Sequence, residues 1–345
     1  MKKTSQLLGI LLAGIITFAV AACGQGGGAP SGQGGQQEIQ IAVTHYPVVL
    51  HSLPYQVGKE RGIFKEEGVK IDRIISSSGG GTTVRSVLAG ELAFGDVAAP
   101  AAIQAYLTGA PISIVSGTVP SVADSYYVTT KDSPIQRPED LTGKRLAYSN
   151  PGSNTQIALL LSLEELGIDP TSVNLVAAGG LSEGLTLLNE GNVDAAPLLE
   201  PVYSDQRQDW KTIYHFSDYV PKVQATVLIA NPRVVEENPE LVRSFIRAYQ
   251  KSVDWIYQNP EEAGRIFAKN AKVAEEAGIS AVNAGVKAEF WDTAIYPEAI
   301  NNTVKGMRMA AILEEGEEID WEGLLNQDFL PEDKRADISA LDSNK

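Results

Sequence analysis

The stretch SSSGGGTTVRSVLAGELAFGD, Ser76–Asp96, sets the plan of the chain. Three glycines form a polar turn, a one-sided helix follows, and Gly90 supplies the left-handed residue with which many helices end. An apolar strand is predicted directly before this stretch and a short strand at its end. Strand, glycine-rich turn, helix and strand in this order are typical of a parallel α/β unit.

A second stretch repeats this plan about 100 residues later. AAGGLSEGLTLLNEGNVD, Ala177–Asp194, has the same glycine-rich turn and the same apolar helix. We align Gly80 with Gly180 and Gly90 with Gly191. A self-similarity of this length predicts two related α/β lobes. Ligands of such units bind beyond the carboxyl ends of the strands, so we expect a binding cleft between the lobes.

The beginning of the chain predicts export and a lipid anchor. A short basic segment precedes the apolar stretch Leu7–Val20, and small residues then lead to Cys23, the single cysteine. This order is typical of a signal peptide, here residues 1–22, and Cys23 stands where a lipoprotein carries its lipidated cysteine. An ordinary signal peptide followed by a stray cysteine is the alternative. Residues 23–37, rich in Gly, Gln and Ser, are predicted to form a lipid-anchored flexible linker.

Composition and charge exclude several classes of function. The chain has 345 residues and a net charge of −15, which argues against nucleic-acid binding and against electrostatic docking to anionic lipid. No stretch after the signal peptide is apolar enough to span a bilayer. The three histidines, His45, His51 and His215, lack the spacing of a metal site and do not suggest a serine triad. We therefore predict no metal and no cofactor.

Strand and helix signals divide the exported part into two lobes. Residues 38–122 alternate short strands and helices, which predicts a largely parallel sheet for lobe 1. Residues 123–230 form lobe 2 in this prediction. The remainder, 231–345, is mainly helical and is assigned to lobe 1. Within it, Asn238 caps a predicted helix over 239–258.

Several short motifs follow one another in a fixed order. Taken together, they resemble the substrate-binding lipoproteins of ABC importers, in the family that handles nitrate, sulfonates and taurine, and thiamine-precursor pyrimidines. Ala93 departs from this family, which usually has Asp there, and Leu199 replaces the usual Trp. The motifs are KERGIFKEEG at 59–68, LAGELAFG at 88–95, DLTGKR at 140–145, PGS at 151–153, EGNVDAA at 190–196 and EP at 200–201.

The resemblance implies a fold, a location and a set of partners. The fold is α/β, two-lobed and periplasmic-binding-protein-like (type II), with the ligand in the inter-lobe cleft. The chain would cross between the lobes at 119–126 and near Ala230, and the C-terminal helices would return to lobe 1. The implied protein is an extracytoplasmic monomer, held to the membrane by a lipid on Cys23. Its partners would be a small-molecule ligand and the ABC permease and ATPase subunits.

Candidate ligand contacts come from both lobes. His45 and Tyr46 follow the first strand and form a cleft wall in the resembling family, although Tyr-Pro alone is an ordinary turn. The hydroxyl and N–H groups of the first glycine-rich turn and of PGS suit an oxyanion, or simply cap their helices. Arg85 lies inside the predicted helix and is assigned a surface or inter-helix role. The predicted contacts are His45, Tyr46, Ser77, Gly79, Gly80, Thr82, Asp96, Val97, Ser116, Tyr126, Asn150, Ser153, Asn154, Thr155, Glu200 and Tyr203.

The class of ligand is predicted from the charges near these loops. No Lys or Arg falls on a predicted cleft loop, whereas Asp96, Asp124 and Glu200 fall near it. Buried carboxylates favour a partner that donates hydrogen bonds, and Tyr126 and Tyr203 could sandwich a planar ring. A planar N-heterocycle, a thiamine-precursor pyrimidine or a flavin-like ring, is therefore predicted. A sulfonate, taurine or nitrate is the alternative, because helix N-termini bind oxyanions without a cation.

Three functions remain open on the sequence. The first is the binding component of an importer, with no catalytic residue. The second is a tethered sensor that passes ligand occupancy to a membrane receptor. The third is an enzyme of pyrimidine synthesis. That third function is disfavoured because the related enzymes depend on a cysteine-rich motif, and no cysteine follows Cys23.

The predicted anchor can be tested by one substitution. Cys23→Ser removes the only thiol that could carry a lipid, so the protein should move from the membrane to the soluble fraction with unchanged ligand affinity. Cell fractionation measures the first outcome and calorimetry the second. Retention of Cys23→Ser on membranes would contradict the lipoprotein interpretation.

Overall fold

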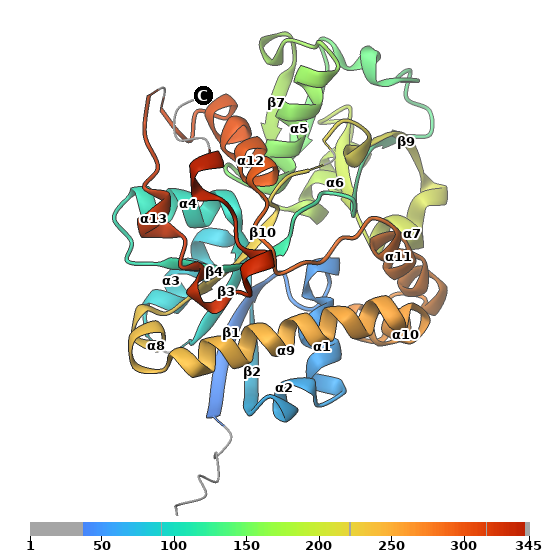
Figure 1. The fold of residues 1–345 in the computed structure, drawn as a ribbon. Coiled ribbons are helices and arrows are strands. Elements are labelled where there is room, and N and C mark those ends of the chain that lie inside the picture. Colours follow the sequence, from blue (N-terminus) through green and yellow to red (C-terminus); the bar gives the residue numbers. More distant parts are fainter. Residues whose placement is uncertain (1–36, 91, 221, 315, 342–345) are drawn as a thin grey trace, which may run out of the picture. The chain divides into compact units, whose positions relative to one another are not determined.

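The computed structural model describes residues 37–341, apart from 91, 221 and 315. The predicted signal peptide, Cys23 and the linker up to residue 36 lie outside the described residues. Lobe 1 contains a five-stranded sheet in the order β2-β1-β3-β10-β4 (Figure 1). Its strands are β1 (Gln37–Thr44), β2 (Val69–Ser77), β3 (Phe94–Ala98), β4 (Ser113–Val119) and β10 (Thr226–Ala230).

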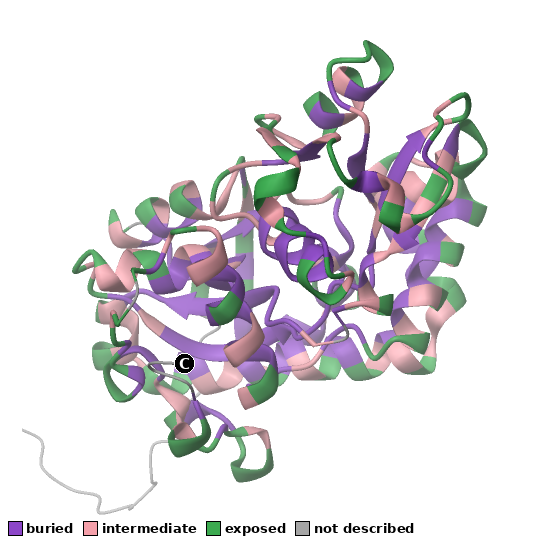
Figure 2. Cartoon of the chain, turned by 90° about the horizontal axis from the view of Figure 1, so that it is seen from above, coloured by how far each residue is buried: buried purple, intermediate pink, exposed green. Residues whose placement is uncertain are grey.

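Apolar side chains make this sheet the centre of lobe 1. β1 pairs in parallel with β2 and β3, as the repeated strand-helix order predicts, whereas β10 runs antiparallel to β3 and β4. The residues of β3 and β10 are nearly all buried, and buried residues follow the strands in Figure 2. The helices before β4 are α1 (Leu53–Glu60), α2 (Ile63–Glu66), α3 (Gly80–Leu88) and α4 (Ala99–Leu107).

Lobe 2 repeats the same strand arrangement. The order β8-β5-β9 is antiparallel, β6 and β7 are parallel, and a bridge between Leu146 and Ala195 joins the two groups. The combined order β7-β6-β8-β5-β9 matches that of lobe 1, with one antiparallel strand in the same place. The elements are β5 (Ser125–Thr130), β6 (Arg145–Tyr148), β7 (Asn174–Ala177), β8 (Ala196–Leu199), β9 (Trp210–His215), α5 (Asn154–Glu165), α6 (Leu181–Asn189) and α7 (Val202–Gln206).

The repeat predicted from the sequence is confirmed, with a shift of one residue at its first glycine. α3 and α6 are preceded by the extended N-cap glycines Gly79 and Gly180, so Gly79 and not Gly80 is the counterpart of Gly180. Both helices end before a glycine with positive φ, Gly90 at 89° and Gly191 at 71°. These two conformations favour glycine because a Cβ destabilises the left-handed region.

The predicted end of lobe 2 near Ala230 is wrong by one strand. Thr226–Ala230 is β10, and it pairs with β3 and β4 of lobe 1. The segments that cross between the lobes are therefore 120–124 and 219–225. They are hydrogen-bonded to each other, from Val223 N–H to the Pro120 carbonyl at 3.4 Å, next to the bond from Ala225 N–H to the Val119 carbonyl at 2.9 Å. The sequence of β10 is apolar throughout and does not reveal which sheet it joins.

The long C-terminal helix is the one predicted. α9 (Pro239–Gln258) is capped by the Asn238 side chain, which accepts a hydrogen bond from Leu241 N–H at 3.3 Å. Its apolar face covers lobe 1, where Phe245 stacks on Phe94 with ring centroids 4.1 Å apart. The neighbouring helices are α8 (Pro232–Glu237), α10 (Pro260–Ala271), α11 (Glu275–Lys287), α12 (Pro297–Met309) and α13 (Trp321–Leu324).

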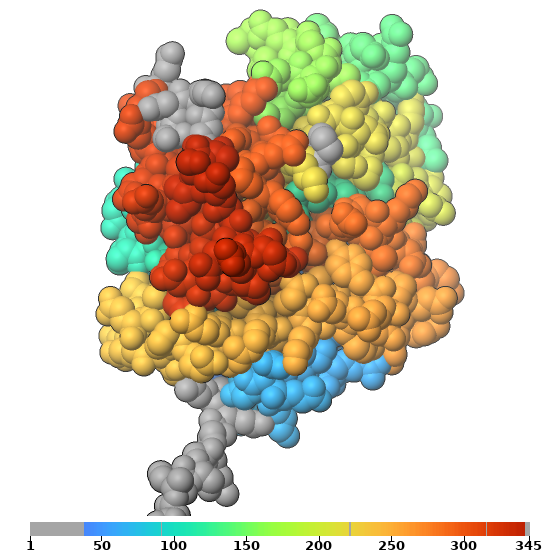
Figure 3. Space-filling model, in the orientation of Figure 1, coloured from blue at the N-terminus to red at the C-terminus, as the bar shows by residue number. Residues whose placement is uncertain are grey.

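The C-terminal helices α8, α9 and α10 pack on lobe 1, whereas α11 and α12 contact lobe 2 as well as lobe 1. Lys305 of α12 pairs with Glu164 of α5 at 2.6 Å, and Ser280 of α11 lies 3.1 Å from Ser204 of α7. In Figure 3 the red C-terminal residues lie directly above α9, next to the orange α12. The C-terminal part therefore contacts both lobes. In the described part of the chain, no helix combines the length and hydropathy needed to cross a membrane.

Candidate functional site

A cavity of about 540 Å³ lies between the two lobes. β1 and β2 end beside it in lobe 1, and β6 ends beside it in lobe 2, where the repeat predicted a ligand. Both crossing segments contribute walls, through Ser121, Val122 and Asp124 on one side and Ala225 on the other. The apolar part of the lining consists of Val49, Val84, Leu88, Val119, Val122, Ala158, Leu181, Leu199, Phe216 and Phe290, with several alanines.

The first turn of α3 opens onto the cavity through Gly79, Gly80 and Gly81. The first N–H groups of a helix have no partner within it, and here no side chain caps them. Gly80 also has a packing role, because a methyl group there would collide with Ala101 of α4. The glycines thus allow close packing of α3 against α4. They also leave N–H groups at the cavity that an anion or a carbonyl-bearing ligand can accept from.

α5 offers a second helix N-terminus from lobe 2. Ser153 caps it by accepting a hydrogen bond from Gln156 N–H at 3.3 Å, as predicted from the sequence. The Oε1 atom of the Gln156 side chain accepts a hydrogen bond from Gly152 N–H at 2.7 Å. Asn154 Oδ1 is buried and has no hydrogen-bond partner among the described residues. A buried carbonyl oxygen without a donor is costly, so a donor on a bound molecule would be favourable there.

The second glycine-rich turn differs from the first. The Glu183 side chain folds back over the N-cap of α6, where a methyl group on Gly180 would collide with its carboxylate. This carboxylate interacts favourably with the positive end of the helix and leaves no room for an anion at that point. The two turns are therefore related in backbone but not in the ligand chemistry that they offer.

Two neutral histidines line the lobe 1 wall. His51 Nε2 lies 3.0 Å from the Thr44 carbonyl oxygen, which can only accept, so Nε2 carries the hydrogen. Burial and, to a smaller extent, the neighbouring His45 lower the pKa of His51 to about 4, against the opposite effect of the hydrogen bond to Thr44. The ring is therefore neutral at pH 7 and its Nδ1 keeps a lone pair. Burial also lowers the pKa of His45, against the opposite effect of Glu183.

Three buried carboxyl groups lie in or near the site. Asp124 lines the cavity, accepts a hydrogen bond from Ser125 Oγ at 2.8 Å, and has its pKa raised by burial to about 6. Burial raises the pKa of Glu200 to about 7 although Ser204 donates to it from N–H and Oγ. Asp96 lies outside the cavity lining, where Tyr55 OH donates to it at 2.8 Å, and burial raises its pKa to about 7.

The structure brings seven of the predicted contacts to the cavity and leaves nine outside its lining. The nine are buried in strands, point elsewhere or already have partners. Tyr126, for example, stacks on Tyr203 with ring centroids 3.5 Å apart and on His215 with centroids 4.4 Å apart, so its ring already has two aromatic neighbours. The seven are His45, Gly79, Gly80, Asn150, Ser153, Asn154 and Thr155; the nine are Tyr46, Ser77, Thr82, Asp96, Val97, Ser116, Tyr126, Glu200 and Tyr203.

Other lining residues were missed by the sequence interpretation. Arg85 is exposed, as its predicted surface role implies, and donates to Thr82 Oγ1 at 3.1 Å. It also lines the cavity, which the sequence interpretation missed. The spacing could have indicated this, because Arg85 lies one turn after Gly81 on the same helix face. It is the one Lys or Arg among the described residues of the lining. Phe290 reaches the cavity from the segment after α11, and no local pattern in the sequence predicts this.

Two α/β lobes of equal strand order, two crossing segments and a cavity between them define the periplasmic binding protein fold. Solved structures agree: the periplasmic aliphatic sulphonate binding protein of Escherichia coli superposes with a TM-score of 0.64 at 16% identity, over 80% of this chain and 86% of that one. A likeness at this identity establishes the fold and no more.

The sequence also matches the family model described as NMT1/THI5 like over residues 50–263. The chain belongs to this family. A formylaminopyrimidine-binding protein of Halalkalibacterium halodurans is 27% identical over 68% of this chain and 71% of its own length. A 4-amino-5-hydroxymethyl-2-methylpyrimidine phosphate synthase of Legionella pneumophila is 25% identical over 66% of this chain and 72% of its own length.

The raised pKa of Asp124 predicts a pH dependence of stability. A carboxyl whose pKa is higher folded than unfolded binds its proton more tightly in the folded state, so the free energy of unfolding falls as pH rises from about 4 to about 6. Asp124→Asn has no carboxyl at this position, so the fall in the free energy of unfolding, on the order of 2–3 kcal/mol once the pH is above 6, should be absent. Denaturant titrations from pH 4 to 8 measure it, with the exposed Asp72→Asn as control. Equal slopes in both variants would contradict the assignment.

Proposed function

We propose that this protein is the extracytoplasmic substrate-binding component of an ABC importer and that it captures a planar N-heterocycle between its lobes. A thiamine-precursor pyrimidine is the preferred ligand and a flavin-like ring the next. Membership of the NMT1/THI5-like family, the fold and the pyrimidine-binding relative support the general class. The choice among ligands depends on the chemistry of the cavity.

The observation that carries the proposal is a set of hydrogen-bond acceptors in one cavity. Asp124 presents a carboxylate, Asn154 an unpartnered buried oxygen among the described residues, and His51 a neutral ring with a free Nδ1 lone pair. Acceptors facing a cavity favour ligands that donate, such as ring N–H and exocyclic amino groups. The apolar lining from both lobes suits the faces of a planar ring.

A sulfonate or another small oxyanion, such as taurine or nitrate, is the second candidate. Arg85 and the exposed N–H groups of Gly79–Gly81 lie on the same wall and form an anion site of ordinary chemistry. The side chain of Arg85 is exposed, whereas Asp124 is 8% exposed and faces the same space. An ionised Asp124 repels an anion, which makes this candidate the weaker one.

The remaining parts of the proposal concern location and partners. The lipid anchor on Cys23 and the flexible linker would keep the protein at the outer face of the membrane, as a monomer that delivers ligand to a permease with ATPase subunits. We propose binding without catalysis, although one relative is named as a synthase. A sensor that uses the same cavity would need a receptor in place of the permease, and gene neighbours would distinguish the two.

Calorimetry on protein stripped of ligand tests the ligand class. The probes are 4-amino-5-hydroxymethyl-2-methylpyrimidine, riboflavin, taurine, an alkanesulfonate and nitrate. Asp124→Asn should weaken a bound heterocycle by ~1.5–3 kcal/mol, the usual contribution of a hydrogen bond to a charged group, whereas Arg85→Gln should change its affinity little.

Glu200→Gln serves as the matched control, because Glu200 is a buried carboxyl outside the cavity lining and bonded to Ser204. Its effect should be well below that of Asp124→Asn. Binding of a sulfonate alone, lost in Arg85→Gln and retained in Asp124→Asn, would establish the second candidate and contradict the first.

A further inference from the structure

A segment from the C-terminal part, residues 289–296, reaches the cavity through Phe290. Phe290 is 1% exposed and lines the cavity, far along the chain from the other lining residues. The next residue, Trp291, is held in lobe 1, where its ring N–H donates to the Leu50 carbonyl at 3.2 Å. Tyr257 OH donates to the Trp291 carbonyl at 3.0 Å. We call residues 289–296 the wall segment.

The wall segment pairs with the end of β4, the outer strand of the lobe 1 sheet. Gly117 N–H donates to the Thr293 carbonyl at 3.0 Å, and Asp292 N–H donates to the Thr118 carbonyl at 3.2 Å. The approach requires glycine in β4, because a methyl group on Gly117 would overlap the Ala294 carbonyl oxygen. The first crossing segment begins directly after this pairing.

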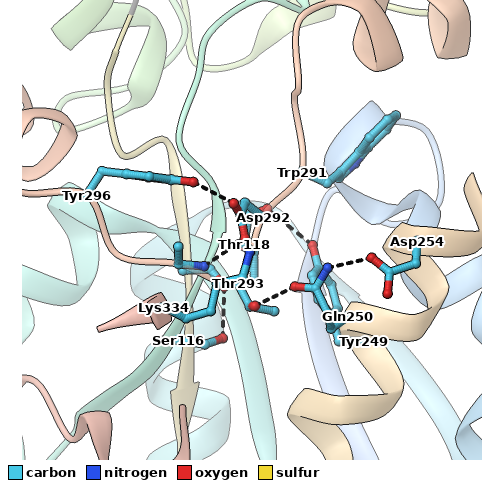
Figure 4. A network of polar contacts seen from close by, with 12 residues as sticks. Ser116, Thr118, Tyr249, Gln250, Asp254, Trp291, Asp292, Thr293, Tyr296 and Lys334 are labelled. Atoms are coloured by element: carbon cyan, nitrogen blue, oxygen red, sulfur yellow. Dashed lines mark hydrogen bonds and ion pairs between the residues drawn. The ribbon is translucent and has the colours of Figure 1, made fainter. Parts of the chain in front are cut away.

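One partly buried ion pair fixes the middle of the wall segment (Figure 4). Asp292 accepts hydrogen bonds from Lys334 Nζ and Tyr296 OH, both at 2.6 Å, and from Ala294 N–H at 3.0 Å. Its side chain is 18% exposed and that of Lys334 is 27% exposed. Burial opposes ionisation of Asp292, but these three donors outweigh it and lower the pKa. Removing Lys334 would leave a half-buried carboxylate without its cation.

The chain that follows the wall segment holds the second crossing segment. Gln224 N–H donates to the Ala299 carbonyl at 3.0 Å, and the Asn302 side chain donates to the Lys222 carbonyl at 2.7 Å. Lys222 also lies over the Tyr296 ring, 5.3 Å from its centroid. A single C-terminal stretch is thus bonded to the end of β4, directly before the first crossing segment, and to the second crossing segment, and its Phe290 lines the cavity.

We infer that Phe290 is a ligand-contacting residue and that Asp292, paired with Lys334, is the residue that positions it. Phe290 supplies an apolar face for the bound molecule, and this part of the inference rests on the proposed function. The positioning by Asp292 and Lys334 does not, since it concerns the ligand-free protein. The ion pair holds the wall segment against Gly117 and Thr118, and this contact keeps Phe290 at the cavity.

Hydrogen exchange of the ligand-free protein tests the positioning. Lys334→Met should speed exchange of the Gly117 and Asp292 amides ~10-fold or more, because their bonds depend on the wall segment staying docked. Lys305→Met removes an ion pair of equal length from Glu164, on α12, and should leave those two amides unchanged. Lys334→Arg should restore slow exchange. Equal exchange in Lys334→Met and Lys305→Met would overturn the positioning role.

Calorimetry with 4-amino-5-hydroxymethyl-2-methylpyrimidine, or whichever probe binds the unaltered protein, tests the contact. Phe290→Ala should weaken binding ~10-fold or more, as loss of a central aromatic contact does. Phe290→Leu should recover most of the affinity, and Lys334→Met should fall between them. Unchanged affinity in Phe290→Ala would overturn the contact. If no probe binds the unaltered protein, the proposed function fails, while the exchange result still decides the positioning.

Discussion

The pairing of the two crossing segments is the constraint on which the rest of the structure depends. Val119 and Pro120 accept hydrogen bonds from Ala225 and Val223, so the crossings run together as an extension of β4 and β10. This pairing is possible because β10 enters the lobe 1 sheet antiparallel to its neighbours. It brings the carboxyl ends of β1 and β6 to the same cavity, and it makes the crossings themselves part of the cavity wall.

The cavity differs in chemistry from the protein that surrounds it. The chain is strongly acidic, and that excess says little about the ligand, since local groups decide the field inside a cavity of this size. Here the local groups are a carboxyl with a raised pKa, two neutral histidines and one exposed arginine. Their balance favours a neutral ligand with hydrogen-bond donors over an anion, and the Glu183 carboxylate covers the N-terminus of α6, so that helix offers no anion site.

The features that depend on residues close together in the sequence could be predicted from it. The glycine-rich turns, the Ser153 cap, the left-handed Gly90 and Gly191 and the stripe of α9 follow from neighbouring residues, and the structure has them. The sheet to which β10 belongs could not be predicted, because an apolar strand of five residues fits either sheet. Tyr126 and Tyr203 were predicted to face a ligand. In the structure the Tyr126 ring stacks on Tyr203 and on His215, contacts that only tertiary structure reveals. Phe290 reaches the cavity by contacts made far along the chain, and its own sequence neighbours carry no sign of them.

The most direct test of the account is a crystal structure of the protein with 4-amino-5-hydroxymethyl-2-methylpyrimidine added at saturating concentration. The account predicts the ring between the lobes, with its amino and ring nitrogens within hydrogen-bond distance of Asp124, His51 Nδ1 or Asn154 Oδ1. An empty cavity at saturation, or the ring bound outside the space between the lobes, would contradict the central claim that this cavity selects a hydrogen-bond-donating heterocycle.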